Sequence, residues 1–267
     1  MAKIARMNRF PEADKYKAYT LLIPPSVFDR FRIDPWTGKN REGEQAVHID
    51  APCGGCEISV RASLSPRDRD PVFHTEICES RDLVQLRWDF IMINDPDSPR
   101  FDTDVTPEGG NRWLNWRRRN HKEEKRAQAF GLAPGQVRRG LRLTGEIIRC
   151  LEKFAKAAGF KSIFLEALFY HNAIQYERHG FRYFEGEEAM RHIHEGFKPG
   201  GPLYRRLDGS FFRRPCLADT VRGRSWLIHS GILDEVWEQG FDTWTPPRMY
   251  KMVGKDFQVR TAPDLPF

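Results

Sequence analysis

The chain has no long hydrophobic run. A membrane-spanning helix needs about 18 uninterrupted apolar residues, whereas the most hydrophobic segment, residues 162–170, is short and carries Glu166. The first residues lead into Pro11 and Glu12 instead of the apolar stretch of a secretory signal. We therefore expect a cytoplasmic protein that does not enter a membrane.

Cysteine is scarce, and so are repeats and linkers. The chain has 5 cysteines, an odd number spread thinly, which makes a disulfide framework improbable and a reducing compartment the expected one. Because there is no internal repeat and no Ser/Gly-rich linker, solenoid and flexible multidomain architectures are also excluded.

Apolar and basic residues are well represented. A hydrophobic content of 40% with 12% aromatics is enough for a sizeable core, despite 30% charged residues. The net charge of +6 favours contact with phosphates, anionic cofactors or acidic partners. The excess is modest and 37 acidic residues share the surface, so we do not expect nucleic acid to be a partner.

The first half of the chain divides into three segments of different composition. Residues 1–45 are irregular and rich in turn pairs, with one apolar run, residues 19–23, that predicts a strand. Residues 57–62, 72–78 and 83–93 have strand character and are bounded by Pro, Asp or Ser, which predicts an antiparallel meander. Residues 111–130 are basic and aromatic, and we interpret them as a helix whose charges are solvated, with an anion-binding surface as the alternative.

The segment after this stretch has the clearest periodicity. Apolar residues recur at helical spacing from Leu143 to Ala158, and Gly159 supplies a C-terminal cap, which predicts an amphipathic helix. A buried strand over residues 160–169, a short helix over 172–179 capped by Asn172, and a strand over 181–184 are expected to follow.

A basic loop, residues 132–142, precedes the long helix. It carries Arg138, Arg139 and Arg142 next to the helix N-terminus, where unpaired backbone N–H groups and the positive end of the helix dipole favour a phosphate or pyrophosphate. The loop alone fits an exposed basic loop as well as an anion-binding site. The order of the elements that follow it favours the anion-binding site.

This order resembles the GNAT acyltransferase superfamily. In that family a Val-x-Pro strand end runs into an Arg/Gln-x-x-Gly-x-Gly loop that binds the pyrophosphate of coenzyme A, and a Tyr-Glu-x-x-Gly-Phe ending follows. Here Leu132-Ala133-Pro134 is similar to the first part, Arg139 and Gly140 lie in the second, and residues 176–181 match the third. Counted from Gly140, Arg142 stands at the position of the second glycine; counted back from Gly159, Arg142 and Thr144 stand at the positions of both glycines.

The resemblance implies site residues. Its cofactor-binding set is Gln136, Val137, Arg138, Arg139, Gly140, Leu141, Arg142, Leu143 and Asn172. It also implies that Tyr176 protonates the departing thiolate, with a half-buried packing role against Phe181 as the alternative. Helical character in residues 111–130 further implies an insertion between the preceding strand and the loop.

Other titratable residues are open to several interpretations. His74, Glu76 and Asp89 in the meander are candidates for the general base. A Cys-x2-Cys at Cys53 and Cys56, with His74 and Cys78 further on, has a zinc-like spacing, but only one half is a tight knuckle, so we expect no metal. The aspartate-rich residues 94–104 lack the central glycine of a calcium loop.

We predict an α/β (α+β) fold with a mixed, mainly antiparallel sheet flanked by helices. The expected divisions are an N-terminal arm (1–45), a GNAT-like core (46–184) and a C-terminal extension (185–267) with a closing strand at 248–253. The resemblance implies transfer of an acyl group, most simply acetyl, from acetyl-CoA or another acyl-CoA to a small-molecule or peptide amine. The alternative is an inactive binding protein that uses its basic surface for nucleic acid or an acidic partner. A homodimer is left open.

Overall fold

The computed structural model describes residues 3–65, 67–80, 85–110 and 119–267. The chain forms two compact units, each built from three segments. Unit 1 comprises Met1–Ser98, Gly140–Leu165 and Tyr250–Asp256, and unit 2 comprises Pro99–Arg139, Glu166–Met249 and Phe257–Phe267. These interleaved segments do not coincide with the contiguous divisions 1–45, 46–184 and 185–267.

Unit 1 contains the predicted antiparallel meander. Its strands are β1 (Val47–Asp50), β2 (Glu57–Ala62), β3 (Phe73–Glu79) and β4 (Gln85–Ile93), each paired antiparallel with the next. Buried side chains alternate along β2 and β3, because successive residues of a strand point to opposite faces. One face therefore forms core and the other carries polar residues.

The last strand of the meander, β4, pairs antiparallel on one side and parallel on the other. The register of β3 and β4 shifts between Glu76 and Ile77, which pair with Phe90 and Trp88, so Asp89 is an extra residue in β4. On its other side β4 pairs parallel with β5 (Ser162–Glu166). With β6 (Arg182–Glu185) and β7 (Arg248–Met252), the strand order is β1-β2-β3-β4-β5-β7-β6. The predicted mixed, mainly antiparallel α/β class and the closing strand are confirmed.

The N-terminal region is more ordered than expected. It forms α1 (Lys3–Met7), α2 (Glu12–Tyr19), the 3₁₀ helix η1 (Thr20–Leu22) and α3 (Pro25–Phe31). The predicted strand over residues 19–23 is wrong. Tyr19, Leu22 and Ile23 are buried at helical spacing, and a short apolar run does not by itself distinguish a strand from a buried helix.

The predicted amphipathic helix is confirmed as α5 (Thr144–Ala157), which buries five side chains: Ile147, Ile148, Leu151, Phe154 and Ala155. Gly159 follows it with a φ of +77°, the left-handed conformation that favours glycine after a helix. α5 is held against the N-terminal helices, because the Glu146 carboxylate accepts hydrogen bonds from the backbone N–H and hydroxyl of Ser26 at 3.0 and 2.7 Å.

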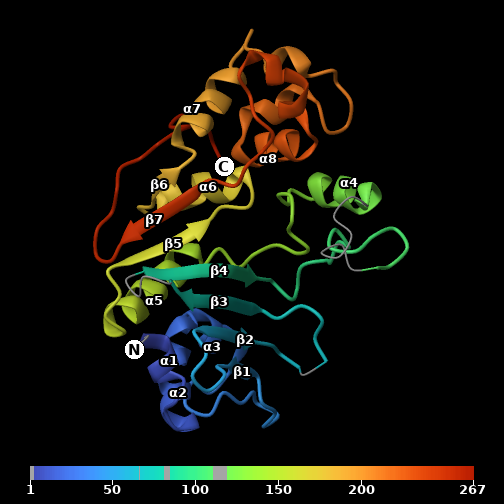
Figure 1. Cartoon of the computed structure of the whole chain (residues 1–267). Helices are drawn as coiled ribbons and strands as arrows, with labels where there is room; N and C mark the ends of the chain where they lie inside the picture. The colour runs from blue at the N-terminus through green and yellow to red at the C-terminus, as the bar shows by residue number, and fades with distance from the viewer. Residues whose placement is uncertain (1–2, 66, 81–84, 111–118) are drawn as a thin grey trace. The chain divides into compact units, whose positions relative to one another are not determined.

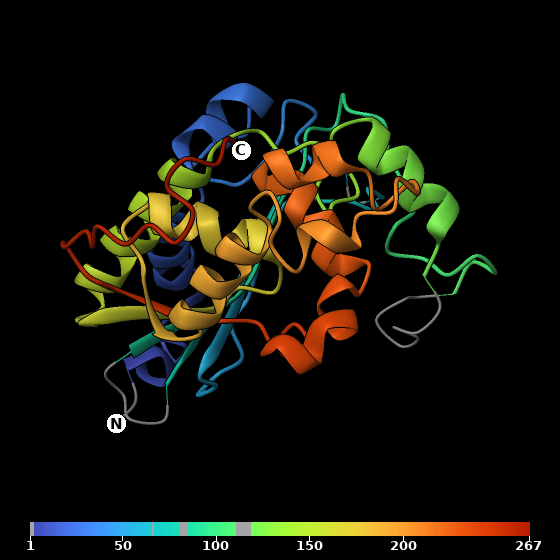
Figure 2. The ribbon, with the colours of Figure 1, turned by 90° about the horizontal axis from the view of Figure 1, so that it is seen from above.

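Unit 2 is mainly helical. Its helices are α4 (His121–Ala129), α6 (Tyr170–Arg178), α7 (Glu187–Gly196), η3 (Tyr204–Arg206), η4 (Pro215–Asp219), α8 (Val221–His229) and η5 (Ile232–Gln239). α6 and α8 lie side by side (Figures 1 and 2). A helix was predicted over residues 111–130. The structure has α4 within this range, beginning at His121, and residues 111–118 lie outside the described residues.

Two local expectations need correction. The predicted strand end Leu132-Ala133-Pro134 is not a strand, since it follows the C-terminus of α4 as a loop. Asn172 does not cap α6, because the helix begins at Tyr170 with Phe169 at its N-cap and Asn172 lies in its first turn. Phe169 is a cap without a capping side-chain hydrogen bond, so the sequence lacks the Ser, Thr, Asp or Asn that normally marks a helix start. Within the described ranges, no helix has the length and apolar character to cross a membrane.

Helix α8 packs on η4 through a glycine. A Cβ atom on Gly223 would lie 2.1 Å from the carbonyl oxygen of Leu217 and 2.7 Å from its Cα, so any side chain would collide with backbone. We expect Gly223→Ala to destabilise the protein by about 1–3 kcal/mol, measured by urea unfolding. Gly110→Ala is the control, because its Cβ would meet only the Thr106 hydroxyl at 3.3 Å. Equal stability of the two variants would contradict this packing.

Candidate functional site

The loop of residues 140–143 leads into α5 and lies beside the end of β4. The two elements are far apart in the sequence, since β4 ends at Ile93 and α5 begins at Thr144. A Cβ atom on Gly140 would lie 3.3 Å from the carbonyl oxygen of Ile93, the last residue of β4. The chain therefore leaves the sheet after Ile93 and returns to the same place at Gly140. Residues 94–139, which include the segment 111–130 that was predicted to be an insertion, lie between these two positions, and the strand end next to the loop is that of β4.

Arg142 adopts an unusual backbone conformation in this loop. Its φ is +61°, in the left-handed region that glycine occupies readily and that costs other residues about 1–2 kcal/mol. Arg142 is exposed and lies two residues before Thr144, where α5 begins. Leu143 is the N-cap and provides no side-chain cap. An exposed arginine thus lies next to the N-terminus of a helix whose N-cap residue makes no side-chain capping bond.

The strand that ends at this loop has an open edge. β4 and β5 pair only from Gln85↔Ser162 to Arg87↔Phe164, whereas β4 continues to Ile93. The two strands diverge toward their carboxyl ends (Figure 1). Among the described residues, the ladder with β5 therefore ends before residues 89–93 of β4. Backbone groups of such an edge can hydrogen-bond an extended ligand that carries amides.

The first half of the predicted cofactor loop belongs to unit 2 and has structural partners there. The Gln136 side-chain oxygen accepts a hydrogen bond from the Ala133 N–H at 2.8 Å and so closes its own turn. Val137 is buried, and its carbonyl accepts from the Phe101 N–H at 2.8 Å. The Arg139 guanidinium lies over the Phe130 ring, 4.2 Å from its centroid. These residues hold the loop in shape, whereas Gly140, Leu141, Arg142 and Leu143 belong to unit 1.

Tyr176 lies in α6, with 7% of its surface exposed. Its ring packs against Phe181 with centroids 5.5 Å apart. Burial raises the pKa of the Tyr176 phenol well above its usual range, so the group keeps its proton at neutral pH. A protonated phenol suits a general acid, and its contact with Phe181 also fits the packing interpretation. Asn172 lies one turn earlier in the same helix and is partly buried.

The polar face of the meander brings two of the three general-base candidates together. His74 Nε2 lies 3.1 Å from a Glu76 carboxylate oxygen and 3.0 Å from the hydroxyl of Ser59. Burial, with a smaller effect of Arg61, lowers the pKa of His74 to about 4, so its imidazole is neutral at pH 7. The third candidate, Asp89, is instead engaged by Arg87 at 2.9 Å.

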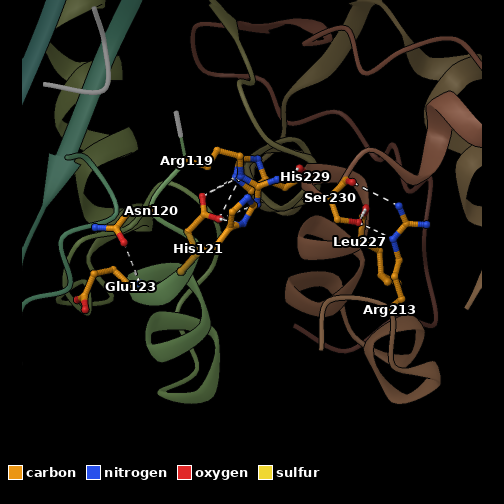
Figure 3. Close-up of polar contacts among 9 residues, drawn as sticks. Arg119, Asn120, His121, Glu123, Arg213, Leu227, His229 and Ser230 are labelled. Carbon is orange, nitrogen blue, oxygen red and sulfur yellow. Dashed lines mark hydrogen bonds and ion pairs between the residues drawn. The ribbon is translucent and has the colours of Figure 1, made fainter. Parts of the chain in front are cut away.

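A buried carboxylate that sequence reasoning missed lies in unit 2. Glu124 of α4 is 1% exposed and accepts hydrogen bonds from the Arg119 guanidinium at 2.7 Å and from His229 Nε2 at 3.2 Å. Figure 3 shows Arg119 and His229 pointing toward each other from the segment before α4 and from the end of α8. Burial alone would raise the pKa of Glu124, but the bonds from His229 and Arg119 outweigh it and lower the pKa to about 2. The group is an anchor between segments far apart in the sequence.

The same unit holds a buried histidine. His171 Nδ1 lies 2.9 Å from the hydroxyl of Ser225, and both residues are at most 5% exposed. Burial, followed by the charges of Arg222 and His229, lowers the pKa of His171 to about 3. A serine beside a histidine is a familiar nucleophile arrangement, but neither group is accessible to a substrate. The pair links α6 to α8.

The structure describes no metal centre. Across the described ranges, no three His, Cys, Asp or Glu side chains are gathered as metal ligands. All five cysteines are free thiols, and Cys53 and Cys56 are exposed. The β2–β3 register places Glu57 opposite Cys78, so Cys56 lies near Cys78 without His74 completing a set.

The sequence contains little that reveals the Glu124 anchor. α4 is charged almost throughout, and its only sequence signal is Asn120, which caps the helix by accepting from the Glu123 N–H. Which of its glutamates is buried depends on His229, 105 residues later. Comparisons of the chain with protein-family models, with curated proteins and with solved structures found no match.

The low pKa of Glu124 predicts an acid-dependent loss of stability. A folded pKa of about 2 against an unfolded value of about 4.3 means that the stabilisation is fully present above pH 4.3 and is lost as the pH falls toward 2. Glu124→Gln should lower the free energy of unfolding at pH 7 by about 3 kcal/mol, because it leaves Arg119 without its carboxylate.

Urea unfolding between pH 7 and pH 2.5 measures this effect. The variant should lose less stability on acidification than the unmodified protein. Glu188→Gln, an exposed carboxylate in the first turn of α7, is the control and should change the free energy by less than about 0.5 kcal/mol. Parallel pH profiles for Glu124→Gln and the unmodified protein would show that the carboxylate carries no net stabilisation.

Proposed function

We propose that the protein is an acyl-CoA-dependent N-acyltransferase that transfers an acyl group, most simply acetyl, to an amine by direct attack. The observation that carries the proposal is the close approach of Gly140 to Ile93, because it creates a strand, loop and helix arrangement from β4, residues 140–143 and α5. A loop between a strand end and a helix N-terminus is a common site for phosphate groups.

The loop suits a pyrophosphate in charge and in shape. Arg142 supplies a positive charge at the start of a helix of 14 residues, whose dipole also favours an anion. Its left-handed φ gives the backbone the path that a glycine would give it at this position. This conformation supports the resemblance to the Gly-x-Gly loop, although the second glycine is replaced by arginine.

The open edge of β4 suits the remainder of the proposed co-substrate. The pantetheine arm of coenzyme A is an extended chain with two amides, and it needs backbone donors and acceptors if it is to leave water. Residues 89–93 of β4, which lie beyond the end of the described ladder with β5, have such groups. The extra residue at Asp89 bends the strand at the point where the pairing ends.

The reaction requires two proton transfers. The amine nitrogen attacks the thioester carbonyl, a C–N bond forms, the C–S bond breaks, and the departing thiolate takes up a proton while the amine loses one. Tyr176 is the proposed acid, because the resemblance implies this role at its position and a phenol is protonated at neutral pH. Glu76, whose carboxylate lies 3.1 Å from neutral His74 on the polar face of the meander, is the proposed acceptor of the amine proton.

Binding of acetyl-CoA to the loop is the first test. Arg142→Glu should weaken the affinity at least tenfold in calorimetry at low salt and should reduce its salt dependence, because it reverses a charge next to the pyrophosphate. Arg32→Glu is a matched control, since Arg32 is also exposed, also has a positive φ (+54°) and lies in the same unit at the end of α3. Equal losses in both variants would indicate only a general charge effect.

The same titration separates the proposal from the non-catalytic alternative. A ligand at 100 times its dissociation constant adds about 2.7 kcal/mol to the stability of the protein that binds it. Acetyl-CoA should therefore raise the melting temperature. An unchanged melting temperature would remove the acyltransferase proposal and favour a binding protein.

Tyr176→Phe tests the proposed acid. Removing the hydroxyl should lower turnover about 100-fold and leave the affinity for acetyl-CoA within twofold, because only the departing thiolate needs the proton. Tyr183→Phe is the control: this buried tyrosine donates to the Glu177 carboxylate at 2.5 Å, so its loss should affect stability more than turnover. Unchanged turnover in Tyr176→Phe would leave the residue with a packing role against Phe181.

A further inference from the structure

Unit 2 contains a pocket that the proposed reaction does not use. It has a volume of about 160 Å³ and lies between α7 and residues 240–247. Its walls include Met190, Ile193 and Leu233, each at most 4% exposed. These side chains belong to the core of the unit, so the pocket has a firm apolar base. An apolar cavity of about 150 Å³ holds a benzene ring, which sets the size of a ligand.

Aromatic side chains form one side of the pocket. Phe241 and His192, which both line it, meet edge to face with centroids 4.1 Å apart, and Phe241 is 3% exposed. Trp244 is held by contacts outside the pocket, because it donates its indole N–H to the Leu168 carbonyl at 2.9 Å and packs edge to face on Tyr170. The Trp244 ring is therefore preorganised for a ligand.

The charge of the lining has one sign. Two carboxylates, Glu185 and Asp242, line the pocket, and no lysine or arginine does. Glu185 lies 3.4 Å from the Arg248 guanidinium, which compensates it. Asp242 is exposed and makes no ion pair or side-chain hydrogen bond with any part of the chain that the structure describes. A carboxylate at the edge of an aromatic pocket attracts a cation, and the rings add a cation–π contribution.

We propose that this pocket binds a small organic ammonium ion whose compact apolar or aromatic body fills the space between α7 and residues 240–247 while its charged nitrogen meets Asp242. Anions are disfavoured by the two carboxylates, and larger ligands by the volume. The inference is independent of the acyl transfer proposed above, because the lining residues include none of the residues assigned to that reaction.

The test is calorimetry in the absence of any coenzyme A with three probes of similar shape. Phenethylamine is the cation, 2-phenylethanol its neutral isostere and phenylacetate the anion. We expect phenethylamine to bind at least ten times more tightly than 2-phenylethanol, and phenylacetate to bind most weakly. Equal affinities for cation and neutral isostere, tighter binding of phenylacetate, or no binding of any probe would overturn the proposal.

Variants locate the site. Asp242→Asn should reduce the preference for phenethylamine over 2-phenylethanol to less than threefold, whereas Asp219→Asn, an exposed carboxylate in η4 outside the pocket, should retain it. Trp244→Leu should weaken both probes together, because it removes an aromatic wall and no charge. An unchanged preference in Asp242→Asn would overturn the assignment of the carboxylate and with it the proposal.

Discussion

The close contact between Gly140 and the end of β4 is the constraint on which the rest of the structure depends. The carbonyl oxygen of Ile93 leaves no space for a larger residue without local adjustment, so the returning chain can pass directly over the strand end. That passage sets the start of α5, and α5 in turn provides the apolar face that covers unit 1. The strained backbone of Arg142 belongs to the same turn.

Two kinds of interaction hold the segment between Ile93 and Gly140 in place: apolar packing and a buried carboxylate. Apolar packing contributes through Trp226, which also donates its indole N–H to the Leu132 carbonyl at 2.8 Å. The polar contribution is the buried carboxylate of Glu124 with its two cationic or proton-donating partners. A buried ion pair gives little net stability compared with apolar groups, but it specifies geometry, because an unpaired charge in the same place is costly. In unit 2 the Glu124 carboxylate thus specifies the contact between α4 and the end of α8.

The sequence predicted what local periodicity determines. α5, the meander and the closing strand follow from apolar spacing and turn residues, and all three are present. Residues 19–23 were misassigned because a five-residue apolar run satisfies both a strand and a helix face. The strand next to the cofactor loop was placed at residues 132–134 instead of β4, since local pattern carries no information about where an excursion returns.

For the candidate site, sequence identified the residue types but not their grouping. His74 and Glu76 were candidates because of their chemistry, and the contact of His74 with the Ser59 hydroxyl depends on strand register. The burial of Glu124 depends on His229 and could not be derived from α4 alone. Long-range pairing of this kind is decided by tertiary packing, which a single sequence does not display.

The interleaving of the two units has a consequence for how the chain folds during synthesis. Unit 1 is completed only when residues 250–256 have been made, after nearly all of unit 2 has emerged. The first 98 residues contain the meander but lack β5 and α5, so β4 leaves the ribosome with its partner strand still unsynthesised. Domains normally fold as units in order of synthesis, and contacts between distant segments slow folding. The edge of β4 therefore stays without its partner until β5 (residues 162–166) has been made.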